Sequence, residues 1–309
     1  MVEKVESIWM NGQLVPWEEA NVHVLSHALH YGTGVFEGIR AYDNENGTAI
    51  FRLRDHMERL HRSAATYSIP LDHSVDELVD AAQQTVAANG LTACYIRPIT
   101  FYGTGTIGLN PARAELMTAI IAFPWGAYLG EDGLRNGIRV LVASWARISP
   151  QAFPAAKATG PYINAILANQ EATDQGYDEA LMLTSDGNVS EGSGENLFMV
   201  RDGSVITPPL SDGCLDGITR QSVMTLLADD GIEVIEKSMT VDDLTAADEL
   251  FFTGTAAEVT PIRQVDEDEV REPGPVTRRA QELFQGAVSG KLEAYRGWLD
   301  YIANSPRTN

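Results

Sequence analysis

The chain has 309 residues, enough for a substantial core and for two domains. Hydrophobic residues make up 44% and aromatic residues 8%, which is typical of a globular enzyme. The longest apolar stretch, residues 117–129, contains Pro124, so no segment is expected to span a membrane. Two cysteines, Cys94 and Cys214, are too few for a disulfide framework or a cysteine-ligated zinc site, and we expect a cytoplasmic protein.

The charge balance is strongly acidic. Asp and Glu number 43 against 22 Lys and Arg, a formal net charge of −21. Such a surface repels phosphate backbones, which makes nucleic acid a poor partner. Only Lys4, Lys157, Lys237 and Lys291 are lysines. Acid excess with few lysines favours a protein adapted to concentrated salt over an ordinary acidic cytosolic protein, since salt screens the self-repulsion.

The first half of the chain mixes strand and helix patterns. Asn11-Gly12 favours a type I′ hairpin turn between two apolar segments. A helix is expected from about Asp55, because Met57, Leu60 and Ala64 then share one apolar face. The other expected elements are hairpin strands at 7–10 and 13–15, a helix at 75–88, and strands at 93–101 and 115–123.

A break follows at Pro124, Gly126 and the glycine-bearing residues 130–137, and it predicts an interdomain loop. The elements expected after it are a strand at 138–145, a helix at 162–174, strands at 179–184, 189–201 and 204–207, a helix from 217–219, a strand at 250–253, a charged loop at 266–275 and a frayed end at 305–309. This mixture predicts two α/β domains and no Rossmann repeat.

Lys157 is the first candidate for chemistry. No Asp or Glu lies within four residues of it, and its neighbours are small and uncharged. Desolvation in such a segment would favour the neutral, nucleophilic amine. A solvated loop lysine is the alternative, and for an isolated lysine it is the more common situation.

Tyr95 and Arg97 are two residues apart on an expected strand, so their side chains point to the same face. A phenol beside a guanidinium on one face could bind a carboxylate. Cross-strand packing with a surface salt bridge explains the same pattern equally well. Arg59 follows Asp55 by one helical turn, so spacing alone favours a local ion pair between them.

Two turns could bind an anion. Gly217-Ile218-Thr219 opens an expected helix, whose free N–H groups and dipole favour a phosphate. The small residues 253–257 follow a strand and allow close backbone approach. Each turn is also consistent with plain capping or turn formation. His27 and His30 share a helical face without a completing ligand set, so hydrogen-bonding roles are favoured over metal binding.

One compound motif is specific. VSEGSGENLF at 189–198, followed by VIT at 205–207 and LDGITR at 215–220, resembles the signature of class IV aminotransferases. The resemblance extends over nearly the whole chain and is closest to branched-chain amino acid aminotransferases. The further matching stretches are HALHYG at 27–32, VFEGIR at 35–40, HMERL at 56–60, YIR at 95–97, FPWGAY at 123–128, FTGTAAE at 252–258 and GPVT at 274–277.

The resemblance implies the α/β fold-type IV architecture, similar to D-amino-acid aminotransferase. It implies a small N-terminal domain at residues 1–125, an interdomain loop at 126–137 and a larger C-terminal domain at 138–309. The site would lie between the domains and be completed by a partner subunit, so at least a homodimer is expected. The cofactor would be pyridoxal 5′-phosphate, and no metal is expected.

The resemblance also implies residue roles. Lys157 would be the catalytic lysine that forms the Schiff base, Glu191 the carboxylate at the pyridine nitrogen, and Tyr162 a contact of the ring hydroxyl. The other cofactor-binding residues would be Leu215 and, at the phosphate, Arg59, Ile218, Thr219 and Thr255. Substrate carboxylates would meet Tyr95, Arg97, Thr255 and Ala256, and an apolar pocket would be lined by Phe36, Trp125, Tyr128, Tyr162 and, from the neighbouring subunit, Tyr31 and Leu109.

The expected reaction moves the amino group between leucine, isoleucine or valine and 2-oxoglutarate, with glutamate as the co-substrate pair. D-amino-acid aminotransferase and aminodeoxychorismate lyase are alternatives of the same fold, because both share a lysine and a glutamate in these roles. A noncatalytic carrier of the cofactor, or a structural oligomer, is an alternative of another class. Substrate-clamp residues beside cofactor residues argue against that last class.

Overall fold

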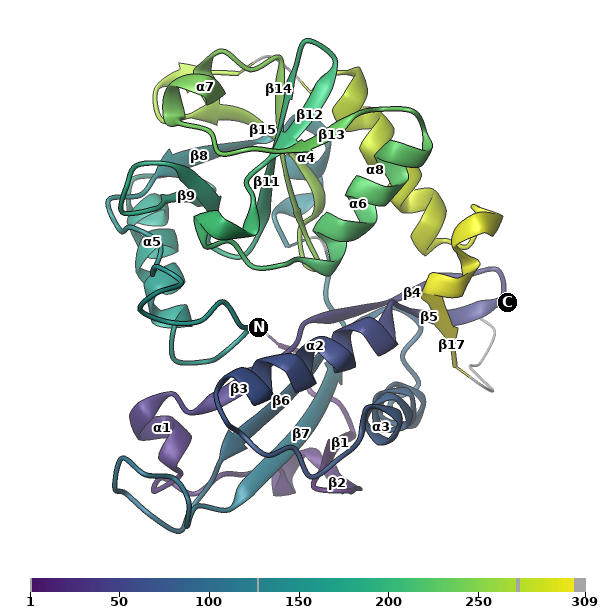
Figure 1. Cartoon of the computed structure of the whole chain (residues 1–309). Coiled ribbons are helices and arrows are strands. Elements are labelled where there is room, and N and C mark those ends of the chain that lie inside the picture. Colours follow the sequence, from purple (N-terminus) through teal and green to yellow (C-terminus); the bar gives the residue numbers. More distant parts are fainter. Residues whose placement is uncertain (1, 127, 271–272, 303–309) are drawn as a thin grey trace. The chain divides into compact units, whose positions relative to one another are not determined.

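The computed structural model describes residues 2–126, 128–270 and 273–302 (Figure 1). Contacts divide them into two compact units. Unit 1 contains residues 2–125, 156–160 and 287–302, and unit 2 contains the rest. Two segments expected in the C-terminal domain thus belong to unit 1. Residues 299–301 do so because they pair with a strand at 49–51. The expected frayed end, 305–309, lies outside the described residues.

Unit 1 is built on an antiparallel sheet. Its strands are β1 (Ser7–Met10), β2 (Gln13–Pro16), β3 (Gly34–Phe36), β4 (Ile39–Asn44), β5 (Gly47–Phe51), β6 (Cys94–Tyr102), β7 (Leu116–Phe123) and β17 (Leu299–Tyr301). Within the described residues their order is β17-β5-β4-β6-β7-β1-β2, with β3 also on β6. Asn11 and Gly12 have φ values of 49° and 96°, so the predicted turn with two positive φ angles is confirmed.

The helices of unit 1 are α1 (His27–Tyr31), α2 (Leu53–Thr66) and α3 (Val75–Ala88), with single 3₁₀ turns at Trp17–Glu19 and Glu293–Trp298. Figure 1 shows α2 and α3 against the sheet. The predicted apolar face of α2 is confirmed, since Met57, Leu60 and Ala64 are at most 1% exposed. The helix begins two residues before the predicted Asp55, because Arg52 takes the capping position with a left-handed backbone.

Unit 2 contains a mixed sheet. Its strands are β8 (Ile138–Val142), β9 (Glu179–Leu183), β10 (Val189–Gly192), β11 (Asn196–Arg201), β12 (Ser204–Thr207), β13 (Val234–Glu236), β14 (Glu249–Gly254), β15 (Glu258–Val265) and β16 (Asp268–Glu269). In the described residues their order is β10-β9-β8-β15-β14-β11-β12-β13, with β16 on β15. The pairs β8/β9, β8/β15 and β12/β13 are parallel.

One predicted strand of unit 2 is wrong. Residues 189–201 form β10 and β11, because the Gly192 N–H donates to the Glu195 carbonyl at 2.7 Å and turns the chain between them. The fold class is otherwise as predicted: both units combine sheets with helices, and neither shows a Rossmann repeat in the described residues.

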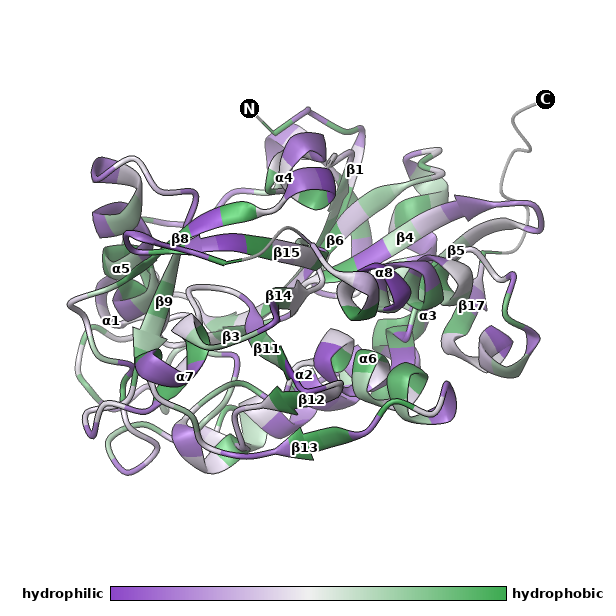
Figure 2. Cartoon of the chain, turned by 90° about the horizontal axis from the view of Figure 1, so that it is seen from above, coloured by the Kyte–Doolittle hydropathy of each residue, from purple (hydrophilic) through white to green (hydrophobic). Residues whose placement is uncertain are grey.

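The helices of unit 2 are α4 (Gly130–Asn136), α5 (Tyr162–Asp174), α6 (Ile218–Asp229), α7 (Val241–Thr245) and α8 (Pro275–Val288), with a 3₁₀ turn at Leu210–Asp212. The predicted helix at 162–174 is confirmed. The segment 126–137, expected as a loop, contains α4, which is mostly hydrophilic in Figure 2. None of the helices in the described residues has the length and apolar character needed to cross a membrane.

Candidate active site

Lys157 belongs to unit 1, where its segment lies beside β3. Val35 and Ala158 form an antiparallel bridge. The Phe36 N–H donates to the Lys157 carbonyl at 3.0 Å, and the Lys157 N–H donates to the Ser63 hydroxyl of α2 at 3.2 Å. Ala158 is 3% exposed and joins the core of the unit. Strand β3 and helix α2 therefore hold the backbone of Lys157 on both sides.

A glycine contact permits this close approach. Gly32 ends α1 with a φ of 65°, a conformation that favours glycine. A Cβ atom on Gly32 would lie 2.6 Å from the Cα of Gly160, so a side chain there would displace the lysine segment. The Thr159 hydroxyl also donates to the Gly32 carbonyl at 2.7 Å. Gly32 thus connects the HALHYG motif to the placement of Lys157.

The amine of Lys157 and the guanidinium of Arg97 both lie against the ring of Phe36. Lys157 Nζ lies 5.0 Å from the ring centroid, and Arg97 Cζ lies 4.8 Å from it. Arg97 Nη2 donates to the Tyr95 hydroxyl at 2.9 Å, so the predicted common direction of Tyr95 and Arg97 is confirmed. Arg97 Nε is buried without a hydrogen-bond partner in the described residues. The arginine therefore retains a donor for a ligand.

Aromatic side chains extend this cluster. Tyr95 and Trp125 are in edge contact with ring centroids 4.5 Å apart, and Phe123 stacks on Trp125 at 5.7 Å. Gly38 packs directly on Tyr95, since a Cβ atom at Gly38 would lie 2.0 Å from the Tyr95 hydroxyl oxygen. Unit 1 thus places an amine, a guanidinium and a phenol beside an aromatic surface.

Arg59 is held by Glu37 and not by Asp55. Arg59 Nε and Nη2 donate to the two carboxylate oxygens of Glu37 at 2.7 and 2.8 Å. The predicted Arg59–Asp55 ion pair is wrong, because Asp55 instead pairs with Arg52 at 2.5 Å. The fork geometry of a guanidinium and the burial of Glu37, which is 0% exposed, favour the observed pair.

The Glu37 carboxylate also accepts from His56 Nδ1 at 2.7 Å. Burial by itself would raise the pKa of Glu37, but the charge and hydrogen bonds of Arg59 outweigh it and hold that pKa well below its usual range. Burial lowers the pKa of the His56 imidazole, which the hydrogen bond to Glu37 opposes. Glu37 is therefore an ionised anchor for Arg59.

Tyr31 and Leu109 lie on an exposed part of unit 1. The Tyr31 hydroxyl donates to the Ile107 carbonyl at 2.9 Å, and Leu109 is 82% exposed. His27 bonds the Thr33 hydroxyl and the Gly108 carbonyl through its two ring nitrogens, and His30 Nε2 bonds the Val24 carbonyl. The predicted hydrogen-bonding roles of the two histidines are confirmed.

Glu191 is a predicted site residue of unit 2. It is 6% exposed on β10. Its Oε1 lies 2.6 Å from Arg147 Nε, in an ion pair whose angle falls outside that of a hydrogen bond. Its Oε2 accepts from the Leu215 N–H at 2.9 Å. A buried carboxylate held on both oxygens in this way has a defined direction.

The predicted phosphate residues of unit 2 occupy two turns. Ile218 and Thr219 are buried in the first turn of α6, and their N-cap residue, Gly217, has no side chain to cap the helix. Thr255 and Ala256 are half-buried in the turn that joins β14 to β15. Helix α6 packs against β14 within this unit. Backbone N–H groups at the start of a helix suit an anion.

The two remaining predicted residues also lie in unit 2. Tyr162 is the first residue of α5 and is half-buried. Tyr128 lies just before α4 and is 41% exposed. Their roles stay predictions.

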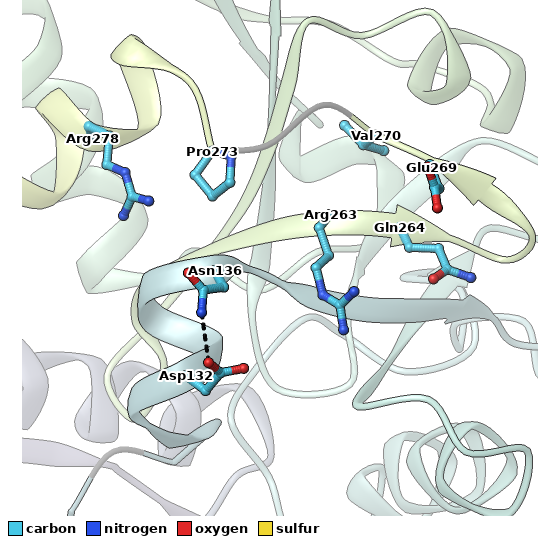
Figure 3. Close-up of a pocket in the computed structure, with 8 residues that line it drawn as sticks. All are labelled: Asp132, Asn136, Arg263, Gln264, Glu269, Val270, Pro273 and Arg278. Atoms are coloured by element: carbon cyan, nitrogen blue, oxygen red, sulfur yellow. Dashed lines mark hydrogen bonds between the residues drawn. The ribbon is translucent and has the colours of Figure 1, made fainter.

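A separate cavity of about 420 Å³ lies elsewhere in unit 2 (Figure 3). Arg263 donates from Nε to the Gly137 carbonyl at 3.0 Å, and Arg278 from Nη2 to the Arg135 carbonyl at 2.6 Å. No predicted site residue lines this cavity, whose walls carry charges of both signs. Its lining residues are Asp132, Asn136, Arg263, Gln264, Glu269, Val270, Pro273 and Arg278.

Sequence reasoning missed two charged partners, Glu37 and Arg147. Glu37 stands inside the VFEGIR motif, so the motif offered a signal that residue types alone did not. No sequence motif pointed to Arg147, because its ion pair with Glu191 forms only when unit 2 folds. Among the described residues, no group of three or more His, Cys, Asp and Glu side chains is arranged to hold a metal ion.

Comparisons with known proteins define the class. Residues 34–265 match the family described as amino-transferase class IV. The chain therefore belongs to the class IV aminotransferase family, as its motifs predicted.

The relatives narrow the comparison further. The branched-chain-amino-acid aminotransferase of Escherichia coli K12 is 49% identical over 304 residues, covering 97% of this chain and 98% of that protein. A crystal structure of the Escherichia coli branched-chain enzyme matches with a TM-score of 0.95 and 48% identity, covering 97% of this chain and 100% of that one. The branched-chain enzyme of Thermobaculum terrenum, solved in its PLP-form, matches with a TM-score of 0.91 and 36% identity over 97% of this chain and 99% of that one. The predicted fold-type IV class is confirmed.

Proposed function

We propose that this chain is a pyridoxal 5′-phosphate-dependent branched-chain L-amino acid aminotransferase. It moves the amino group between leucine, isoleucine or valine and 2-oxoglutarate. The observation that carries the proposal is the meeting of the Lys157 amine and the Arg97 guanidinium at one aromatic ring, that of Phe36. The Escherichia coli relative, at about half identity over almost the whole chain, has this activity in its name, and the Thermobaculum terrenum enzyme was solved with the cofactor bound.

The residues present fit the cofactor. The buried carboxylate of Glu191 suits a protonated ring nitrogen, and the start of α6, which Gly217 leaves without a side-chain cap, suits a phosphate. We assign the aldehyde to Lys157, the ring nitrogen to Glu191 and the ring hydroxyl to Tyr162. We assign the phosphate to Arg59, Ile218, Thr219 and Thr255, with Leu215 beside the ring through its bond to Glu191.

The bound cofactor supplies an electron sink for the carbanion at the substrate α-carbon. The Glu191 carboxylate would bind the ring nitrogen in its protonated form. Lys157 would take the proton from the substrate α-carbon as general base and return it as general acid. The segment held by β3 and α2 keeps its Nζ directed to one place for both steps.

Tyr95 and Arg97 bind the substrate carboxylates. The Tyr95 hydroxyl accepts from Arg97 at 2.9 Å, so its own hydrogen is available to a carboxylate, as is the buried Arg97 Nε. The backbone of Thr255 and Ala256 adds further donors. Phe36, Trp125, Tyr128 and Tyr162 offer apolar surface to a branched side chain. The D-amino-acid and aminodeoxychorismate activities lack this support from paired Tyr95 and Arg97.

Four measurements on purified protein test the function. Borohydride reduction should attach the cofactor to Lys157, and Lys157→Ala should abolish transamination. Addition of L-isoleucine should change the cofactor absorbance, whereas a noncatalytic carrier would show no such change. L-leucine should react and D-alanine should not. Attachment to another residue, or turnover of D-alanine in place of L-leucine, refutes the proposal.

We also propose that the chain forms at least a homodimer. Unit 1 exposes a group of large apolar side chains at Val22, Val24, Leu25, Leu29, Tyr31, Ile107 and Leu109. Exposed apolar residues in such number are typical of a protein–protein interface. Tyr31 and Leu109 would then line the side-chain pocket of the neighbouring subunit. We propose likewise that the two units correspond to the small N-terminal and the larger C-terminal domain of this fold. We also propose that the protein is cytoplasmic and adapted to concentrated salt.

A further inference from the structure

The two oxygens of the Glu191 carboxylate are held by two different segments of unit 2. Arg147 meets Oε1, and the backbone N–H of Leu215 meets Oε2. Both segments lie outside regular helix and strand, so neither is held in place by a continuous backbone ladder. A buried asparagine side chain forms hydrogen bonds with the backbone of each segment.

Asn164 ties down the segment that carries Arg147. It lies in the first turn of α5 and is 9% exposed. Its Nδ2 donates to the Ala146 carbonyl at 3.0 Å, and its Oδ1 accepts from the Ile148 N–H at 3.1 Å. One side chain therefore binds the backbone on both sides of Arg147 and limits where the guanidinium can point.

Asn196 ties down the turn that carries Leu215. It begins β11 and is 5% exposed. Its Nδ2 donates to the Leu215 carbonyl at 2.8 Å. Its Oδ1 packs against Gly217, where an added Cβ atom would lie only 2.0 Å away. The residue thus fixes the peptide whose N–H binds Glu191 and the glycine that starts α6.

We propose that Asn164 and Asn196 are positioning residues that fix the direction of the Glu191 carboxylate, one for each oxygen. The inference rests on the proposed function, because it concerns the contact of Glu191 with the cofactor ring nitrogen. Groups that orient metal-binding side chains commonly change affinity or activity by about 10–100-fold when they are removed, and we expect the lower end of that range here because the two asparagines act through the segments of Arg147 and Leu215.

A matched control exists in unit 1. Asn89 makes the same two-sided clamp on Ser7, donating to its carbonyl at 2.9 Å and accepting from its N–H at 2.9 Å. Neither Asn89 nor Ser7 belongs to the predicted site. Asn89→Ala therefore removes an equivalent clamp and reports its effect on stability alone.

The experiment titrates apoprotein with pyridoxal 5′-phosphate and with its 1-deaza analogue, in which a carbon replaces the ring nitrogen. Asn164→Ala and Asn196→Ala should each weaken binding of the natural cofactor by about tenfold. Binding of the analogue, which makes no bond from that position, should change by less than about threefold. Asn89→Ala should leave both affinities unchanged while lowering the melting temperature of the apoprotein.

Equal weakening of both ligands in the Asn164 and Asn196 variants would show a merely structural role and overturn the inference, as would unchanged affinity for both. If either alanine variant fails to fold, the Asn→Ser variant at that position is measured in the same cycle. The wild-type arm separates the two proposals. A wild-type protein that does not bind the natural cofactor refutes the function and the inference together, whereas a wild type that prefers it over the analogue leaves the variants to decide.

Discussion

Gly38→Ala tests whether the contact between Tyr95 and Arg97 serves substrate binding. A Cβ atom on residue 38 would lie 2.0 Å from the Tyr95 hydroxyl oxygen and 2.9 Å from its Cζ. Ordinary contact begins at 3.4 Å, so the hydroxyl must move by about 1.4 Å. The 2.9 Å hydrogen bond from Arg97 cannot survive that movement. A misplacement of about 1 Å in such a group costs about 10²-fold, or roughly 2.7 kcal/mol of transition-state stabilisation.

The assay is kcat/KM for L-leucine, with cofactor affinity measured in parallel. We expect kcat/KM to fall by about 10²-fold in Gly38→Ala, with little change in cofactor affinity, because the three atoms nearest the added Cβ all belong to Tyr95 and none to a predicted phosphate or ring-nitrogen residue. Gly297→Ala is the matched control, since nothing lies within 4 Å of its added Cβ atom. Tyr95→Phe removes the colliding oxygen, so the double variant with Gly38→Ala should lose less than the product of the single losses.

Two results would refute this reasoning. A Gly38→Ala enzyme that keeps kcat/KM within about threefold of wild type would show that Tyr95 does not position substrate. Fully multiplicative losses in the double variant would show that the alanine acts somewhere other than the Tyr95 hydroxyl.

Three further predictions concern pH, assembly and salt. The pKa values of Glu37 and His56 are both lowered from their ordinary 4.5 and 6.5, so the folded chain binds fewer protons than the unfolded chain. The free energy of unfolding should therefore fall as the pH drops below 6.5, and again as it drops below 4.5. Glu37→Gln should lower the free energy of unfolding by about 3 kcal/mol at pH 7 and weaken its dependence on acid pH, as measured by denaturant titration. An unchanged dependence of stability on pH would contradict the role of Glu37 as the anchor of Arg59. Leu109→Asp should shift sedimentation towards monomer and reduce turnover without lowering the melting temperature of the monomer, and an active, unchanged oligomer would exclude the interface. With a net charge of −21, near-ultraviolet circular dichroism should show lost tertiary structure in dilute buffer and its return near 1 M salt, where the screening length is about 3 Å; full structure in dilute buffer would remove the salt hypothesis.

Local patterns predicted many of the elements. The Asn11-Gly12 turn and the helices Val75–Ala88 and Tyr162–Asp174 were expected where they occur. The structure shows a local cause for two of them: positive φ angles at the Asn11-Gly12 turn and a capping box between Ser74 and Glu77 at the start of the helix Val75–Ala88. Strand β4 and helix α8 were not predicted, and α4 was expected to be a loop, because contacts with distant segments stabilise these elements more than local preference does.

The candidate site likewise contains residues that motifs predicted and contacts that only the folded structure reveals. Motifs predicted Lys157, Glu191, Tyr95 and Arg97, and the structure places Lys157 and Arg97 at one ring. Spacing alone paired Arg59 with Asp55, whereas the structure pairs it with Glu37. Helical spacing accounts for neighbours on one helix, but it contains no information about a carboxylate that arrives from another strand.

The amino-acid sequence by itself determined the family and many of the periodic elements, and it predicted Lys157 as the reactive lysine, because these depend on motifs and on contacts between residues close in the chain. Only the tertiary structure decided that Lys157 is held by β3 and α2 of unit 1, that Glu37 holds Arg59, and that Arg147 and Leu215 hold Glu191. The physical reason is that a buried charge needs a partner of fixed geometry, and folding alone brings such partners together from distant parts of the chain.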